Sequence, residues 1–208
     1  LLSLYDDTKP FSFHIELTDG CNARCPACAR NQILSSQQLI QHPNLASSSI
    51  TLNRFKKIFK YYQQQTRSIV FSGNFGDPVF NPQFANILKY TIDNILIPDS
   101  KHINVLTCTN GGMRSPRWWA NLAKDTKKEN IRNEMVFAID GLTDTNHIYR
   151  VNTRFDRVID NAKAWIGEGG EAQWQWIRFD HNKHQEQEAR EFAKEIGFKS
   201  FQVVNSSR

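Results

Sequence analysis

The hydrophobic residues of this chain fall into two repeating patterns. In short segments, apolar residues alternate with polar ones or run continuously, which is typical of β-strands. Phe13, Ile15 and Leu17 show the alternation, and the segment SIVFS at 68–72 shows the continuous run of a strand buried on both faces. In longer segments, apolar residues recur three and four positions apart, which indicates amphipathic helices.

These two kinds of segment alternate from one end of the chain to the other. Strands are predicted at 13–18, 68–72, 102–107, 135–140, 173–179 and 200–204. Helices are predicted between them at 52–62, 82–97, 116–122, 155–166 and 185–196. Strands that alternate with helices through short joins predict a parallel sheet with helices packed outside it, which is an α/β fold.

Two regions depart from this alternation. Residues 1–12 are expected to be an N-terminal lead-in, because Pro10 disfavours helix just before the first strand. Residues 13–208 are then expected to form a single domain. Residues 31–49 are rich in Gln, Ser, Asn and His, with Pro43 among them, and we predict a short irregular helix followed by a loop.

Composition and charge narrow the class of protein. The 208 residues have a hydrophobic content of 39%, which favours a folded chain, and no apolar run has the length of a membrane-spanning helix. The first residues lack the features of a signal peptide, so a cytoplasmic protein is expected. The chain begins without Met, as expected of a processed or partial polypeptide.

The net charge of the chain is positive. A value of +5 fits an anionic partner such as RNA, but the Lys and Arg residues are scattered along the sequence. Scattered charge favours a solvated basic surface over a nucleic-acid site.

The cysteines give the strongest chemical signal. Cys21, Cys25 and Cys28 follow the first strand with the spacing C-x3-C-x2-C, which indicates a metal site in a reducing compartment rather than a disulfide framework. Thiolate is a soft ligand that suits iron–sulfur clusters and zinc, and both usually take four protein ligands. Three cysteines leave one iron of a cluster open; a zinc knuckle completed by a distant ligand is the alternative. The fourth cysteine, Cys108, is expected to be a small buried side chain.

The C-x3-C-x2-C loop after a first strand resembles that of the radical SAM superfamily, whose members use S-adenosylmethionine (SAM). The segment Phe75-Gly76-Asp77-Pro78 resembles the family's GGEP motif, with Phe75 in place of Gly and Asp77 in place of Glu. Asn110 after the third strand and Asp140 at the end of the fourth also match the family pattern. The resemblance covers about residues 13–205 and implies a partial (β/α)6 TIM-like barrel.

The resemblance also implies roles for individual residues. Cys21, Cys25 and Cys28 are expected to hold a [4Fe–4S] cluster whose open iron binds SAM. Gly76 and Asp77 are expected near the SAM ammonium, Asn110 and Asp140 near the ribose, and Arg150 at the SAM carboxylate, which guanidinium matches bidentately. The family's usual aromatic contact with adenine falls on Ala27 here, so Phe75 is the candidate for that contact.

The implied activity is reductive cleavage of SAM to a 5′-deoxyadenosyl radical that abstracts hydrogen from a substrate. The sequence leaves the substrate open among a peptide, a small molecule and RNA. A low-potential electron donor such as flavodoxin or ferredoxin is the expected partner. Membership of the SPASM/Twitch-like branch is compatible with these motifs, although no further cysteine follows the sixth strand. The alternatives are a non-catalytic iron–sulfur protein for electron transfer or sensing, and an RNA-binding module.

Overall fold

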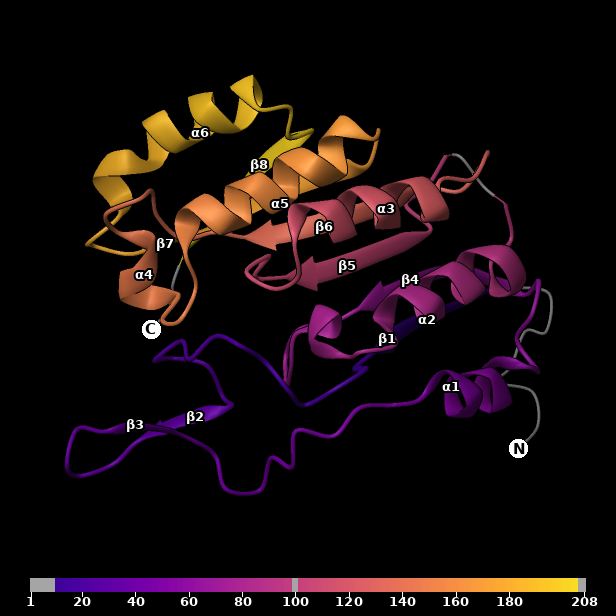
Figure 1. Ribbon diagram of the computed structural model, residues 1–208, viewed down its shortest axis with the longest axis horizontal. Coiled ribbons are helices and arrows are strands. Elements are labelled where there is room, and N and C mark those ends of the chain that lie inside the picture. Colours follow the sequence, from indigo (N-terminus) through magenta and orange to yellow (C-terminus); the bar gives the residue numbers. More distant parts are fainter. Residues whose placement is uncertain (1–9, 99–100, 206–208) are drawn as a thin grey trace.

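The computed structural model describes residues 10–98 and 101–205, and they fold into a parallel sheet covered by helices (Figure 1). The sheet has six strands in the order β1-β4-β5-β6-β7-β8, which is also their order along the chain. Their bounds are β1 Phe11–Ile15, β4 Thr66–Phe71, β5 Val105–Thr109, β6 Asn133–Ala138, β7 Glu171–Arg178 and β8 Ser200–Asn205. All five neighbouring pairs are parallel, which confirms the predicted sheet.

Helices connect the successive strands, as predicted. Their bounds are α1 Leu52–Phe59, α2 Phe84–Tyr90, α3 Pro116–Thr126, α4 Asn146–Tyr149, α5 Phe155–Gly167 and α6 Glu186–Glu195. Figure 1 shows α2, α3, α5 and α6 lying along one side of the sheet. Side-chain caps fix two of the starts, because Thr51 accepts from Arg54 N before α1 and Ser115 accepts from Trp118 N before α3. Beyond α2, a single π-helical turn continues over Thr91–Ile95.

The hydrophobic core lies between the sheet and these helices. Trp174 and Trp176 of β7 are fully buried in it. Trp119 of α3 meets Trp165 of α5 edge to face, with ring centroids 6.4 Å apart. Because side chains alternate along a strand, Gln175 between the two tryptophans faces the opposite, inner side of the sheet.

Residues 31–49 differ from the prediction. Instead of an irregular helix they contain an antiparallel hairpin, β2 Asn31–Ile33 paired with β3 Leu39–Gln41. The turn is closed by Gln37, whose φ of 61° is left-handed, and Leu34 N donates to Gln38 O at 2.9 Å. The prediction of a helix was therefore wrong. The hairpin was missed because polar residues fill this turn and hide the alternation that is typical of strands. In Figure 1 the hairpin stands apart from the main sheet.

Two further expectations from the sequence concern the start of the first strand and membrane-spanning helices. The first strand begins at Phe11, inside the expected lead-in 1–12, of which residues 1–9 lie outside the described part. None of the helices formed by residues 10–98 and 101–205 has the length and apolarity needed to cross a membrane.

Candidate cofactor site

A cavity of about 440 Å³ opens at the carboxyl ends of the strands. Parallel strands end at one edge of a sheet, so this edge collects residues that are far apart in the sequence. The cavity receives side chains from the cysteine loop, the loop after β4, the end of β5 and the segment after α4. Its wall at this edge includes Cys21, Cys25, Cys28, Arg30, Gly76, Asp77, Asn110 and Arg150. We call it the cysteine cavity.

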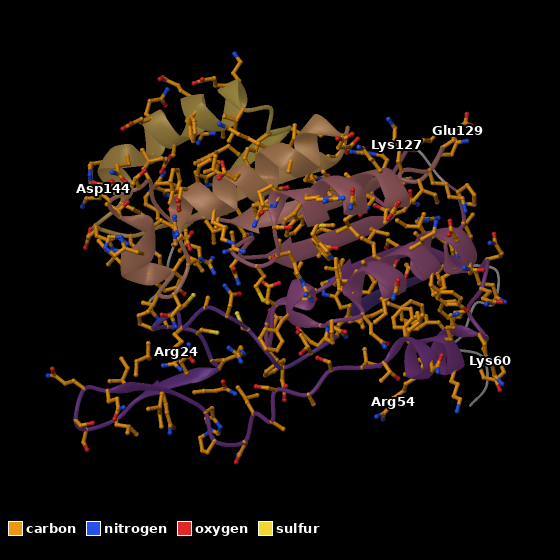
Figure 2. The ribbon with its side chains drawn as sticks, in the orientation of Figure 1. Arg24, Arg54, Lys60, Lys127, Glu129 and Asp144 are labelled. Atoms are coloured by element: carbon orange, nitrogen blue, oxygen red, sulfur yellow. The ribbon has the colours of Figure 1, made fainter. Side chains whose placement is uncertain are left out.

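The cysteine loop brings its three thiols to this one cavity. Cys25 is buried, Cys21 and Cys28 are half-buried, and all three are free. The Cys25 carbonyl fixes the loop without using a sulfur atom, because it accepts from Cys28 N at 3.1 Å and from Asn31 Nδ2 at 2.9 Å. Arg24, on the same loop, is exposed (Figure 2). Lys127 and Glu129 lie at the opposite edge of the sheet (Figure 2).

The surroundings of Cys21 and Cys25 favour the neutral thiol of each until a metal binds. Burial and the nearby Asp77 raise the pKa of Cys21 to about 12. Burial also raises the pKa of Cys25, while Arg150 opposes that rise. Iron binding therefore has to displace these protons. Within the described residues, no three His, Cys, Asp or Glu side chains are gathered tightly enough to hold a single metal ion. Three thiols around one cavity are a donor set that fits an iron–sulfur cluster with one open iron.

Arg30 is a site residue that the sequence analysis missed. Its side chain is only 3% exposed, and Nε and Nη2 donate to Asp19 O at 3.1 and 2.7 Å. Nε also donates to Phe75 O at 2.6 Å. Arg30 therefore joins the cysteine loop to the loop after β4. An Arg two residues beyond the third cysteine is the only local signal for this role.

We expect Arg30→Ala to lower the free energy of unfolding by about 2 kcal/mol, because the partly buried carbonyls of Asp19 and Phe75 lose their charged donor. Urea unfolding of the cluster-free protein measures this change. Arg54→Ala, an exposed change on α1, is the control and is expected to leave the unfolding midpoint in place. Equal midpoints for Arg30→Ala and the parent would contradict the joining role.

Gly76 and Phe75 occupy different surroundings although they are neighbours. A Cβ at Gly76 would lie 2.1 Å from Thr18 O, so only glycine lets this loop pass against the chain that follows β1. Gly76 lines the cysteine cavity. The Phe75 side chain is 55% exposed and lines a separate hollow with Glu16 and Ile58. The structure thus turns Phe75 away from the place expected for an adenine contact.

Asp77 is a buried part of the cavity wall, and both of its carboxyl oxygens accept hydrogen bonds. Its Oδ1 accepts from Val79 N, and both carboxyl oxygens accept from Thr109 Oγ1, each contact being 3.0 Å. Its Oδ2 also accepts from Asn110 N at 2.8 Å and from Asn110 Nδ2 at 2.7 Å. Burial raises the pKa of Asp77, and these donors oppose the rise. Asp77 therefore fastens the loop after β4 to the end of β5 and orients Asn110.

The Asp140 carboxylate is also buried, and it does not line the cysteine cavity, where a ribose contact was expected for it. It is fully buried, and Oδ1 accepts from Ile177 N at 2.6 Å while Oδ2 accepts from Arg150 Nε at 2.6 Å. Burial raises the pKa of Asp140, and Arg150 opposes this. The guanidinium of Arg150, not the Asp140 carboxylate, lines the cysteine cavity, and its Nη1 lies 3.7 Å from Cys25 Sγ. The two residues form one unit with its cation toward the cavity.

Cys108 is not a core side chain, which corrects the sequence expectation. It is half-buried on the inner side of β5 and lines the cysteine cavity beside Ser72 and Gln175. Burial, Asp77 and Glu16 raise its pKa to about 11, so it stays a thiol near neutral pH. It belongs to a strand rather than to the loop that carries the other three cysteines.

Comparisons with known proteins agree with this arrangement. The family model of the radical SAM superfamily matches residues 15–177. Streptococcus suis SuiB bound to S-adenosylmethionine is similar in structure, with a TM-score of 0.69, 19% identity, and coverage of 97% of this chain and 42% of SuiB. The enzyme anSMEcpe with bound AdoMet has a TM-score of 0.61 and 17% identity, and the match covers 94% of this chain and 51% of anSMEcpe. Methylornithine synthase PylB has a TM-score of 0.58 and 12% identity, and the match covers 97% of this chain and 55% of PylB.

No curated protein matches the sequence. The chain spans between two fifths and just over half of the length of these three structures, and at such identities the likeness concerns the fold. It agrees with the partial TIM-like barrel expected from the sequence. The family model covers most of the chain, including the cysteine loop and the strand ends around the cavity. This chain therefore belongs to the radical SAM superfamily of enzymes, with a [4Fe–4S] cluster and SAM as its cofactors.

Proposed function

We propose that this protein cleaves SAM reductively and uses the product radical to abstract hydrogen from a substrate bound in the cysteine cavity. One observation carries the proposal: three free thiols of the C-x3-C-x2-C loop line the same cavity as Gly76, Asn110 and Arg150. The cavity therefore contains both the ligands for a cluster and polar groups that suit the amino-acid and ribose parts of SAM. Cys21, Cys25 and Cys28 would hold the cluster.

When bound, the cluster and SAM supply one electron and a 5′-deoxyadenosyl radical. The protein's own part is to bind and orient. We assign the SAM ammonium to the backbone around Gly76, the ribose to Asn110, and the SAM carboxylate to the N–H groups of Arg150 that Asp140 leaves free. Asp77 and Asp140 would act as positioning residues, because their oxygens already accept from Asn110 and Arg150.

For the substrate we propose a peptide rather than RNA. Among the described residues, the inner wall of the cavity presents Ser72, Cys108 and Gln175 and no Lys or Arg, and Gln175 suits the paired donor and acceptor of an amide. Arg30 and Arg150 are the cavity's only Lys or Arg residues in the described chain; Arg30 donates to backbone carbonyls, and the N–H groups of Arg150 are assigned to Asp140 and to the SAM carboxylate. A phosphate backbone would need free cations. SuiB has been solved with its precursor peptide SuiA, and anSMEcpe with a peptide.

The proposed setting follows from the same chemistry. Free thiols around an oxygen-sensitive cluster suit a reducing compartment, and we propose the cytoplasm. A low-potential donor of the flavodoxin or ferredoxin class would deliver the electron.

The test is SAM cleavage without any substrate. After anaerobic reconstitution and reduction with dithionite, we expect slow formation of 5′-deoxyadenosine and methionine, measured by chromatography, and loss of this activity in air. A fully loaded, reducible cluster that neither binds SAM nor yields 5′-deoxyadenosine would favour the electron-transfer or sensor alternative. Salt-dependent RNA affinity in protein lacking a cluster would favour the RNA-binding alternative.

The substrate class is tested by hydrogen transfer. Deuterated peptides and deuterated RNA, each prepared as a mixed pool, are supplied separately to the reduced enzyme with SAM. Mass spectrometry of 5′-deoxyadenosine is expected to show deuterium only with the peptide pool. Deuterium transferred from the RNA pool would contradict the peptide assignment.

A further inference from the structure

The Arg150 guanidinium lies between a buried carboxylate and a cluster ligand. Its Nε donates to Asp140 Oδ2 at 2.6 Å, and its Nη1 lies 3.7 Å from Cys25 Sγ. The side chain of Arg150 is 15% exposed and that of Asp140 is 0% exposed, so solvent screens this pair weakly. Cys25 is itself only 6% exposed. A cation, an anion and a ligand sulfur are therefore held in a row with little water.

Such a row acts on a cluster electrostatically. Hydrogen bonds to the sulfur atoms, net charge and solvent exposure together set the reduction potential of an iron–sulfur cluster. One-electron reduction adds one negative charge and, here, needs no proton. A guanidinium that donates to Cys25 Sγ stabilises that added charge, whereas the Asp140 carboxylate behind it opposes the charge.

We propose that Arg150 and Asp140 tune the reduction potential of the cluster in opposite directions, Arg150 raising it through its contact with Cys25 Sγ and Asp140 lowering it from the far side of Arg150. This inference rests on the proposed function only in requiring a cluster on Cys25. It gives Arg150 a role toward the cluster in addition to the SAM carboxylate. It also explains why a carboxylate is buried where it cannot reach the cavity.

The other cation of the cavity wall is oriented differently. The Arg30 Nε and Nη2 atoms donate to the carbonyls of Asp19 and Phe75, and no sulfur atom accepts from Arg30 among the contacts of the described chain. Arg24 is exposed and offers a matched control, since Arg24→Gln removes one positive charge from the cysteine loop itself. Exposed charge is screened by water and salt, so this control should have little effect.

The experiment is a redox titration of the reconstituted full chain, followed by electron paramagnetic resonance and carried out without SAM. For Arg150→Gln we expect the ratio of reduced to oxidised cluster at a fixed potential to fall at least tenfold, which for one electron is a shift of about 59 mV to lower potential. For Asp140→Asn we expect a shift to higher potential. Arg150→Lys keeps the charge and should fall between the parent and Arg150→Gln, and Arg24→Gln should match the parent.

Opposite shifts separate tuning from a merely structural role, which would change both variants in the same sense. Iron and sulfide content is measured for each variant, so that only loaded clusters are compared. Potentials that all equal the parent's, or shifts of the same sign in Arg150→Gln and Asp140→Asn, would overturn the proposal. Loss of the cluster from both Arg150→Lys and Asp140→Asn would also overturn the proposal, because the Arg150–Asp140 ion pair would then be needed for the fold of the site. A parent that holds a reducible cluster yet cleaves no SAM would defeat the proposed function alone.

Discussion

Replacing Cys25 with alanine is expected to abolish the cluster, from about four irons per chain in the parent to nearly none. The reason lies in the geometry of the loop. Cys25 is the most deeply buried of the three loop cysteines, and all three line the same cavity. The contacts of its carbonyl with Cys28 N and Asn31 Nδ2 do not involve the side chain, so the backbone path is expected to survive. The variant then lacks one thiolate and little else.

Iron and sulfide analysis after anaerobic reconstitution measures this loss, and Cys108→Ala supplies the matched control. Cys108 lines the same cavity but stands on β5, outside the C-x3-C-x2-C loop. We expect Cys108→Ala to keep the parent's iron content. If iron falls as far in Cys108→Ala as in Cys25→Ala, Cys108 is a ligand and no iron is left open for SAM.

The sequence predicted the sheet and its helices well because each has a strong local pattern. A continuous apolar run marked β4, and apolar residues three and four positions apart marked α1. The same local patterns placed Gly76 and Asn110 at strand ends, and the structure brings both to the cysteine cavity. The hairpin β2–β3 escaped prediction because it is short and polar, and because it depends on a turn at Gln37.

What the sequence could not supply was the partner of each charged group. Asp140 resembled a ribose ligand by its place after a strand, but its oxygens are taken by Arg150, ten positions later, and by the Ile177 backbone on β7. Arg30 had no recognisable motif because its acceptors are carbonyls, which any residue provides. Pairing of this kind is decided when strand ends meet in the folded sheet, and no local pattern records it.

Asp77→Ala is expected to lower the free energy of unfolding by about 3 to 5 kcal/mol, a large effect for one residue. The carboxylate accepts from Val79 N, Thr109 Oγ1 and both nitrogens of Asn110, and it is 4% exposed. Alanine removes the acceptor of Val79 N, Thr109 Oγ1 and Asn110 N, whereas Asn110 Nδ2 still reaches Asn22 Oδ1 at 2.9 Å, and each unmet buried donor costs free energy. Urea unfolding of the cluster-free protein measures the change. Asp180→Ala, which removes an exposed carboxylate paired with Lys183, is the control and should unfold as the parent does.

Asp77→Ala also tests whether Asp77 positions Asn110 or contacts SAM directly. If Asp77 orients Asn110, then Asp77→Ala should weaken SAM binding by the loaded protein, and Asn110→Ala should weaken it to a similar degree, because both changes remove the same oriented amide. If the carboxylate instead meets the SAM ammonium itself, Asp77→Ala should weaken SAM binding far more than Asn110→Ala. Calorimetric titration of SAM into both variants, each with full iron content, distinguishes the two cases. The donors around Asp77 favour the first: they occupy both of its oxygens, and they lead through Asn110 Nδ2 to Cys21 Sγ, 3.5 Å away.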